Sequence, residues 1–269
     1  MSQTTPQTEH PKTGWRGLPR NVWAVSLTSF FMDISSEMVV NLLPLFLANV
    51  LGVRISLIGL IEGIAEMTSS LLKVFSGWFS DRVGERKWLA VAGYGISTLA
   101  KPFFYFAQTW TQVLVVRWAD RVGKGVRTAP RDALVADSID EKQRGLAFGL
   151  HRAADTGGAV VGLLIALGVI WAAQEAAVKL GRDTFQTVVL VSLIPAVLAV
   201  LVLAIGARDV PASSERARPK ITFRGLGRPF LIFLLIVGIW DLCNSSYAFL
   251  VFRAQSLGTS VVGILVMLI

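Results

Sequence analysis

Charged residues and cysteine are both scarce in this sequence. Asp, Glu, Lys and Arg make up 16% of its 269 residues, whereas a soluble domain of this size carries roughly 25%. The only cysteine is Cys243, so an intramolecular disulfide is excluded. The only histidines are His10 and His151, too few and too far apart in the chain for a zinc site. We therefore expect neither a soluble domain nor a bound metal or cofactor.

Hydrophobic residues make up 53% of the chain and are grouped in long runs. The runs are about 20 residues long, which is the length that crosses a hydrocarbon core of roughly 30 Å as a helix. Inside a bilayer the backbone polar groups have no water to bond, so such runs must be helical. They span about 21–49, 56–79, 88–107, 111–136, 146–172, 184–206, 229–252 and an eighth beginning near 259. The sequence thus predicts an all-α integral membrane protein.

Polar stretches divide these runs into groups. Residues 1–20 are rich in Thr, Gln and Pro without the apolar core of a signal peptide, and they are predicted to form a cytoplasmic tail. Residues 21–206 are predicted to form an N-terminal six-helix bundle, followed by a Pro/Ser/Arg-rich cytoplasmic linker at 207–228. Residues 229–269 would then form helix seven and part of helix eight, in a second bundle. Because the chain stops within an apolar run, we expect it to be truncated.

A faint internal repeat agrees with two bundles. The first apolar run has Asp33 near its middle and ends in LANVLG, and the seventh has Asp241 near its middle and ends in RAQSLG. Proteins built from repeated helical halves place their binding sites at the interface between the halves. Asp241 is therefore grouped with the polar residues of the first half.

The net charge of +8 reflects the side of the membrane on which basic residues lie, so no nucleic-acid partner is expected. With a cytoplasmic N-terminus, the cytoplasmic segments contain Lys12, Arg16, Arg20, Arg82, Arg86, Lys87, Lys142, Arg144, Arg208, Arg216, Arg218, Lys220, Arg224 and Arg228. The opposite side contains Arg54, Lys179, Arg182 and Arg253. This asymmetry is typical of the positive-inside rule. It predicts a multi-pass protein of the inner membrane, in contact with the lipid bilayer, with its N-terminus in the cytoplasm.

Three of the predicted helices carry ionisable or polar side chains at spacings that place them on one helical face. Each Arg or Lys facing lipid would cost roughly 2.5–3.5 kcal/mol, or on the order of 10 kcal/mol for the fourth run alone. These faces are therefore predicted to enclose a cavity for substrate and protons. Its residues are Asp33, Glu37, Asn41, Glu62, Glu66, Arg117, Asp120, Arg121, Lys124 and Asp241. The alternative is that the charges are static ion pairs that only fix helix packing. Lys101, beside Pro102, is interpreted separately as a base that extends toward the membrane surface at a kink.

The loop after the second run, GWFSDRVGERK at residues 77–87, resembles a signature of the major facilitator superfamily, G-x-x-x-D-R-x-G-R-R/K, with Glu85 where a base is usual. RVGKGVRTA at 121–129 resembles the family pattern R-x-x-Q-G-x-G-x-A. Gly158–Leu163 partly resembles the antiporter signature G-x-x-x-G-P, with Leu163 in place of proline. The runs DISSEM at 33–38 and DRVGKGVRTAPRD at 120–132 resemble a widespread prokaryotic branch that is known only as MFS-type transporters.

The resemblance implies the fold of that superfamily and a latch in the loop, which controls the change between conformations. The latch residues would be Gly77, Asp81, Arg82, Gly84, Arg86 and Lys87. In family members the partner of the aspartate is commonly the N-terminal end of a helix in the second half. The physical interpretation is that Gly84 permits a tight turn, the bases keep the loop in the cytoplasm, and Asp81 at a helix C-terminus needs a partner. The alternative is a solvated hairpin that only fixes topology.

Together these features predict a secondary active transporter of a small solute that works by alternating access. Protons are favoured over sodium as the coupling ion, because charged pairs are abundant and no sodium site is recognisable. The bases of the fourth run favour an anionic or zwitterionic solute, and the partial antiporter signature favours efflux. A non-transporting membrane sensor or scaffold is the alternative. A membrane-embedded enzyme is less favoured, because no nucleophile–base or metal constellation is visible.

Overall fold

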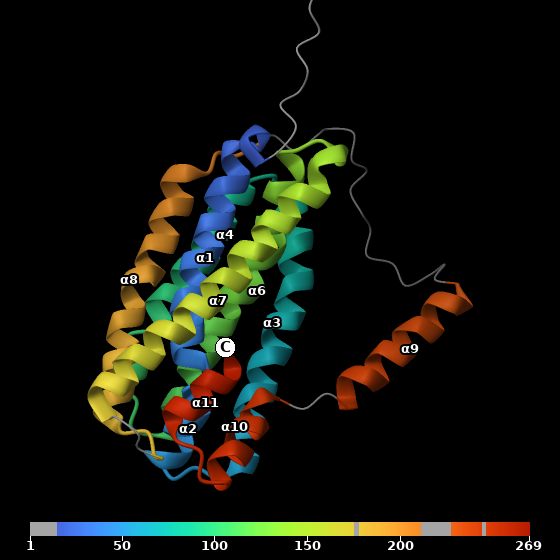
Figure 1. The fold of residues 1–269 in the computed structure, drawn as a ribbon. Coiled ribbons are helices and arrows are strands. Elements are labelled where there is room, and N and C mark those ends of the chain that lie inside the picture. Colours follow the sequence, from blue (N-terminus) through green and yellow to red (C-terminus); the bar gives the residue numbers. More distant parts are fainter. Residues whose placement is uncertain (1–14, 175–177, 211–226, 244–245) are drawn as a thin grey trace, which may run out of the picture.

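A computed structural model of the chain describes residues 15–174, 178–210, 227–243 and 246–269 (Figure 1). Those residues form helices and connecting loops, and they contain no strand. Most of the predicted tail (1–14) and of the predicted linker (211–226) lies outside the described residues, so the proposed division of the chain into two halves remains a prediction.

The helices follow the predicted apolar runs, with some runs divided in two. In chain order they are η1 Trp15–Gly17, α1 Arg20–Val40, α2 Leu43–Asn49, α3 Ile55–Val83, α4 Arg86–Ala100, α5 Phe103–Phe106, α6 Trp110–Asp137, η2 Glu141–Gln143, α7 Arg144–Gln174, α8 Arg182–Gly206, α9 Arg228–Cys243, α10 Tyr247–Ser256 and α11 Val261–Leu268.

Each divided run has a local cause. The first run breaks between α1 and α2, where Pro44 stands in the first turn of α2 and lacks an N–H for a continuous helix. The third run breaks at Lys101-Pro102, before the short α5. The seventh run, predicted as one helix over 229–252, contains α9 and α10 instead. The hydroxyl of Ser246 begins α10 by accepting a hydrogen bond from the Ala248 N–H at 3.3 Å.

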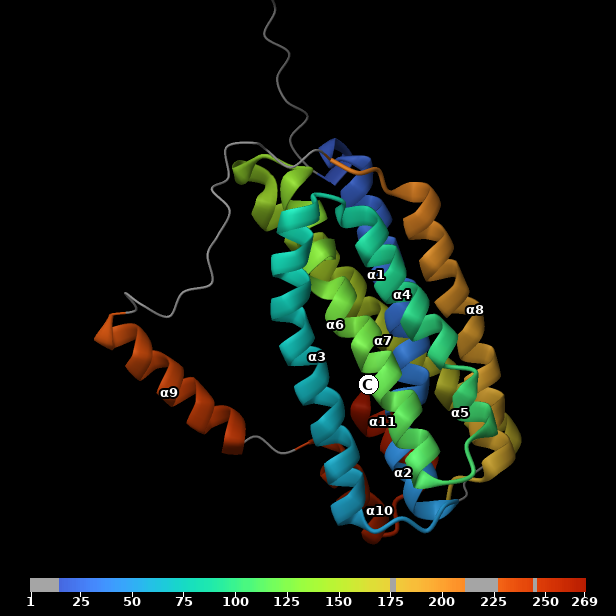
Figure 2. The same ribbon diagram turned by 180° about the vertical axis from the view of Figure 1, so that it is seen from behind.

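Close approach of small residues fixes the interior of the bundle. α1 packs against α7 and α8, while α6 packs against α3 and α4 (Figures 1 and 2). A side chain added at Gly162 of α7 would lie 2.5 Å from the Ile34 carbonyl oxygen of α1, and one added at Gly158 would collide with the Phe30 carbonyl oxygen in the same way. The absence of side chains at these two positions therefore allows the backbones of α1 and α7 to touch.

The surface of the bundle is apolar. Large hydrophobic side chains such as Leu99, Phe106, Ile194 and Ile205 are exposed, whereas several Arg and Lys side chains are buried. Within the described ranges, four helical segments are long and apolar enough to cross a membrane, namely Arg20–Asn49, Ile55–Val83, Glu141–Ala173 and Arg182–Gly206. An apolar exterior around a charged interior is the reverse of a soluble protein, and it is the arrangement that lipid requires.

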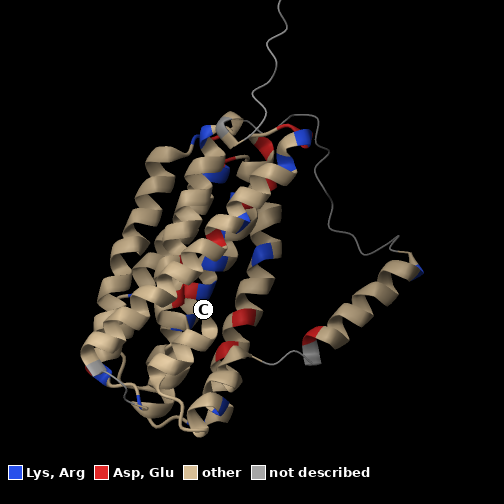
Figure 3. Ribbon diagram, viewed as in Figure 1, with Lys and Arg blue, Asp and Glu red and all other residues tan. Residues whose placement is uncertain are grey.

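Charged residues are unevenly distributed over the bundle. Figure 3 shows Lys and Arg gathered at the end of the bundle where α1 begins and where α6 is joined to α7, with further charges along α3 and α6 inside. α10 packs against α2, and α11 against α7. α9 is exposed along its described length and lies apart from the bundle in both ribbon views (Figures 1 and 2).

Candidate functional site

A cavity of about 760 Å³ lies against α3 and α6, within the range of roughly 300–1,000 Å³ that is usual for small-molecule sites. Its walls come from the end of α1, the start of α2, α3, α6, α9 and α10. The lining residues are Glu37, Val40, Asn41, Pro44, Gly59, Glu62, Gly63, Glu66, Arg117, Arg121, Asp241, Ser246, Tyr247, Ala248 and Val251. Seven of the ten predicted cavity residues are among them.

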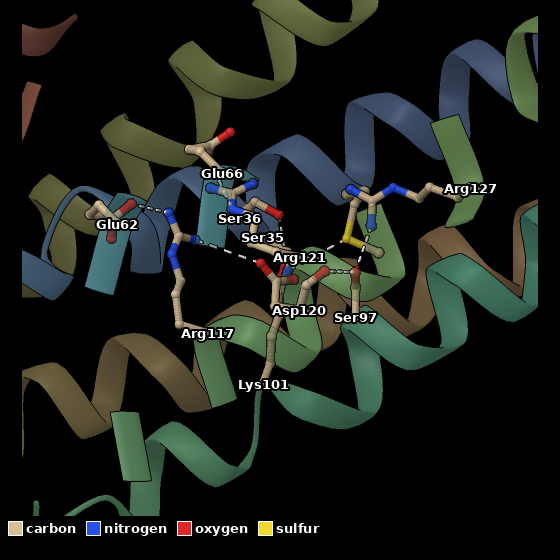
Figure 4. Close-up of polar contacts among 11 residues, drawn as sticks. Ser35, Ser36, Glu62, Glu66, Ser97, Lys101, Arg117, Asp120, Arg121 and Arg127 are labelled. Carbon is tan, nitrogen blue, oxygen red and sulfur yellow. Dashed lines mark hydrogen bonds and ion pairs between the residues drawn. The ribbon is translucent and has the colours of Figure 1, made fainter. Parts of the chain in front are cut away.

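The first ion pair of this site joins α6 to α3. One terminal nitrogen of Arg117 lies 2.8 Å from a carboxylate oxygen of Glu62, and the other lies 3.6 Å from Asp120 (Figure 4). Arg117 is only 1% exposed. Asp120 therefore does not line the cavity but supports Arg117 from behind, on the same helix.

The second ion pair repeats the first one turn further along both helices. Nε of Arg121 lies 3.2 Å from a carboxylate oxygen of Glu66. Glu62 and Glu66 are four residues apart on α3, and Arg117 and Arg121 are four apart on α6, so matching turns face each other. The repeated spacing makes a two-step ladder of charge between these helices.

A third carboxylate faces the cavity from α1. The side-chain amide of Asn41 donates a hydrogen bond to the Glu37 carboxylate at 2.7 Å, and another to the Glu37 backbone carbonyl at 3.0 Å. Asn41 ends α1, so its amide is free to turn back onto the preceding turn. Within the described part of the chain Glu37 has no ion pair with Lys or Arg, unlike Glu62 and Glu66.

The remaining predicted cavity residues lie elsewhere. Asp33 and Lys124 are half-buried in the bundle and are not part of the cavity wall. Asp241 does line the cavity, from α9, while its predicted neighbour Asn244 lies outside the described residues.

Lys101 was not predicted to belong to the interior, and its interpretation as a base at the membrane surface is wrong. The side chain is 2% exposed, and its ammonium donates hydrogen bonds to the hydroxyls of Ser35 (2.5 Å) and Ser36 (3.2 Å) on α1 (Figure 4). Because α4 ends at Ala100 inside the bundle, the next residue turns inward. The adjacent serines of the first apolar run were the available signal in the sequence.

Arg127 is a second buried cation that sequence reasoning left out of the site. It donates a hydrogen bond to the Ser97 hydroxyl at 2.7 Å, and its guanidinium carbon lies 4.4 Å from the centre of the Tyr94 ring. The Ser97 hydroxyl in turn donates to the Asp120 carbonyl oxygen at 3.0 Å. These contacts are all to α4 or α6 itself, so this cation has neutral partners within the bundle.

The loop between α3 and α4 has the geometry its glycines suggested. Gly84 ends α3 with φ of +79°, a left-handed conformation that favours glycine. A side chain at Gly77 would lie 3.3 Å from the Ala129 side chain, so α3 passes close to α6 there. Arg82 lies over the Trp78 ring at 5.6 Å, and Lys87 over the Trp88 ring at 4.8 Å.

Arg86 differs from its two basic neighbours because it is buried. It forms ion pairs with Asp81 at 3.3 Å and with Asp137 of α6, and it donates a hydrogen bond to the Ala133 carbonyl oxygen at 3.0 Å. Asp209, which follows α8, accepts hydrogen bonds from the backbone N–H groups of Arg86 and Lys87. The partner of Asp81 in this structure is thus a residue of its own loop.

An all-helical bundle with an apolar exterior and a charged interior cavity defines an integral membrane protein with a solute-sized internal site. Comparison with known proteins agrees. The profile of the Major Facilitator Superfamily matches residues 25–269. The chain belongs to this superfamily of membrane transporters.

Two of the relatives that it matches are named as transporters. An uncharacterised MFS-type transporter of Methanocaldococcus jannaschii is 36% identical over 244 residues, which are 89% of this chain and 58% of the relative. An uncharacterised MFS-type transporter of Bacillus subtilis is 24% identical over 87% of this chain and 55% of its own. A multidrug resistance protein of Aeromonas hydrophila is 25% identical over 77% of this chain and 48% of its own. The chain spans a little over half the length of the first two.

Solved structures share the fold. A POT family transporter crystallised with 5-aminolevulinic acid superposes with a TM-score of 0.63 at 15% identity, over 92% of this chain and 52% of that one. A bacterial homologue of the human lysosomal transporter Spinster, in an inward-facing conformation, gives 0.61 at 17% identity, over 78% and 47%. At this level of identity the likeness concerns the fold alone.

Proposed function

We propose that the protein is a secondary active transporter that carries a small solute across the inner membrane by alternating access. The observation that supports this most is the cavity whose wall brings together charged residues of α1, α3, α6 and α9. Charges inside a membrane protein mark substrate and ion pathways, because lipid would not tolerate them. The superfamily membership and the transporter names of the relatives support the same function.

Proton coupling is proposed from the carboxylates of this wall. Glu62 and Glu66 each pair with an arginine across the α3–α6 contact. Protonation of either carboxylate would remove its charge and weaken the attachment of α3 to α6, so proton uptake and helix movement would be linked. Glu37 would offer a third site of protonation on α1. Three further residues are proposed to influence the solute and the proton from outside the cavity wall, through their charge and without touching the solute. They are Asp33, Asp120 and Lys124.

The loop from Gly77 to Lys87 is proposed to latch one conformation on the cytoplasmic side. Arg86 connects the end of α3, the end of α6 and the segment after α8 through Asp81, Asp137 and Asp209. Such a junction must open if those helix ends separate. Its place at the basic end of the bundle supports a cytoplasmic location, under the positive-inside rule.

The orientation is tested by cysteine accessibility in a Cys243→Ser background. A single cysteine placed at Ser213 is expected to be labelled from the cytoplasm only, and one at Gln174 from the opposite side only. Labelling of position 213 from outside would contradict the topology on which the proposal rests.

Transport itself is tested with the full-length gene product in proteoliposomes. Glu66→Gln and Asp33→Asn keep the size of the side chain but abolish its titration, so each is expected to lose proton-driven flux at near-normal membrane abundance. Glu141→Gln is the matched control, because Glu141 is exposed beside Arg144 and far from the cavity. If Glu66→Gln and Asp33→Asn transport normally but are poorly expressed, these carboxylates serve the structure and not proton coupling. If the unmutated protein shows no flux, a sensor or scaffold is favoured.

Efflux is proposed as the direction of transport. The relatives named as multidrug resistance proteins and the partial antiporter signature at Gly158–Leu163 support export. Everted vesicles test the direction, since an exporter accumulates its solute in them when a proton gradient is applied and an importer does not.

A further inference from the structure

The charges that face the cavity are unequal. Among the residues that the structure describes, its wall has four carboxylates, on Glu37, Glu62, Glu66 and Asp241, and two cations, on Arg117 and Arg121. Both cations already form ion pairs, Arg117 with Glu62 and Arg121 with Glu66. Once these pairs are formed, the carboxylates of Glu37 and Asp241 remain as an acidic surplus.

Exposure increases this asymmetry. In the first pair the Arg117 side chain is 1% exposed and that of Glu62 is 14% exposed, and in the second the values are 9% for Arg121 and 55% for Glu66. In each pair the arginine is therefore covered by protein more fully than its carboxylate partner. More of the carboxylate surface than of the guanidinium surface is accessible to a solute.

The other bases of α6 do not offset this surplus, although their number in the sequence favoured an anionic or zwitterionic solute. Arg127 is bound to Ser97 and packed on the Tyr94 ring. Arg131 pairs with Asp132 at 2.9 Å and also contacts the Ser29 hydroxyl. Lys124 is not part of the cavity wall.

Most of the rest of the wall is apolar or aromatic. Val40 of α1, Pro44 of α2, and Tyr247, Ala248 and Val251 of α10 all line it. Apolar side chains suit a lipophilic body, and an aromatic face attracts a cation. Asn41 holds the Glu37 carboxylate in place at 2.7 Å without neutralising it.

We infer that the solute of this cavity is a lipophilic organic cation, such as a bulky amine or a quaternary onium ion, whose positive charge lies against Glu37. The inference rests on the proposed transport function for its physiological meaning, but the binding it requires can be measured without transport.

Two ions of nearly the same shape and opposite charge test it, namely tetraphenylphosphonium and tetraphenylborate. Neither titrates, so a difference in their binding reports the charge preference of the site. Equilibrium dialysis would use the protein in nanodiscs of zwitterionic lipid, with empty nanodiscs subtracted. The cation is expected to bind at least about tenfold more tightly than the anion, one step of roughly 1.4 kcal/mol. Equal binding, tighter binding of the anion, or no saturable binding of either would overturn the inference.

Variants of the cavity wall extend the test. Glu37→Gln is expected to lower the affinity for the cation about tenfold. Ser246→Asp adds a carboxylate to the same wall and can still cap α10, so it is expected to raise that affinity. Glu141→Gln should leave it unchanged. If Glu37→Gln does not fold, the gain in Ser246→Asp still decides, because unchanged or weaker binding there contradicts a cation site.

Flux separates this inference from the proposed function. Selective binding of the cation without its movement in proteoliposomes would refute transport and leave the cation site standing. Proton-driven flux of an anion, with tetraphenylborate as the better competitor, would refute the cation site and leave transport standing.

Discussion

Two groups of buried cations on α6 have different surroundings. Arg117 and Arg121 are paired with carboxylates of α3 and border the cavity. Arg127, less than two turns further along, is held by a hydroxyl and an aromatic ring of α4 and does not line it. The nature of the partner distinguishes them: a carboxylate can be neutralised by a proton and release its cation, whereas a serine and a tyrosine ring hold theirs without such a step. We therefore expect the first group to affect solute and proton, and the second to affect folding.

The largest effect should come from breaking the first group at its most buried member. Arg117→Ala leaves Glu62 and Asp120 without their cation, and removal of one partner from a buried ion pair costs about 3–5 kcal/mol. We expect a large fall in thermal stability and in membrane abundance. The double variant with Glu62→Gln should regain part of the loss, since one unpaired charge is removed with it. Normal stability of Arg117→Ala would mean that water already solvates this pair.

The second group should yield a smaller loss that is confined to stability. Arg127→Met keeps an unbranched apolar stem but removes the hydrogen bond to Ser97 and the guanidinium contact with the Tyr94 ring, at a cost of about 1.5–3 kcal/mol for a hydrogen bond from a charged group. Binding of tetraphenylphosphonium per folded molecule should remain unchanged. A tenfold change in that binding, with stability unchanged, would contradict the division between the groups.

The smallest change in stability is expected at the exposed end of the ladder. Glu66 is 55% exposed, and pairs open to solvent contribute about 0–1 kcal/mol. Glu66→Gln should therefore unfold nearly as the unmutated protein does, yet it leaves Arg121 as an unpaired cation at the cavity wall. Affinity for tetraphenylphosphonium should fall about tenfold, and affinity for tetraphenylborate should rise. Unchanged binding of both ions would place Glu66 outside the site.

Replacing Arg121, the partner of Glu66, tests whether its charge alone is needed. Arg121→Lys keeps the charge but loses the planar fork of donors. It should preserve stability to within about 1 kcal/mol, as expected for a partly exposed pair. Proton-driven flux should recover only in part relative to Arg121→Ala. Full recovery would show that charge alone matters at this position.

Hydrophobicity and residue spacing along the chain are enough to predict the helices and their polar faces. Runs such as 184–206 are too long and too apolar for any other structure in lipid, and α8 spans Arg182–Gly206. The four-residue spacing of Glu62 with Glu66, and of Arg117 with Arg121, is a property of each helix alone and was readable in advance. Gly84 likewise ends α3 with the positive φ that its place in the loop suggested.

The neighbours that those faces contact depend on how the helices pack in three dimensions. The pairing of Arg117 with Glu62 depends on α3 and α6 lying side by side in one register, and helical periodicity does not specify the neighbour of a helix. The sequence assigned Arg117, Arg121 and Lys124 of α6 to the cavity, but in the fold Lys124 does not line it and Arg117 is almost completely covered. The fold also turns Lys101 inward at a helix end that hydrophobicity does not mark. The spacing of residues fixes the direction in which a side chain leaves the axis of its helix. The partner and the exposure of that side chain depend on how separate helices pack, and so does the charge of the cavity.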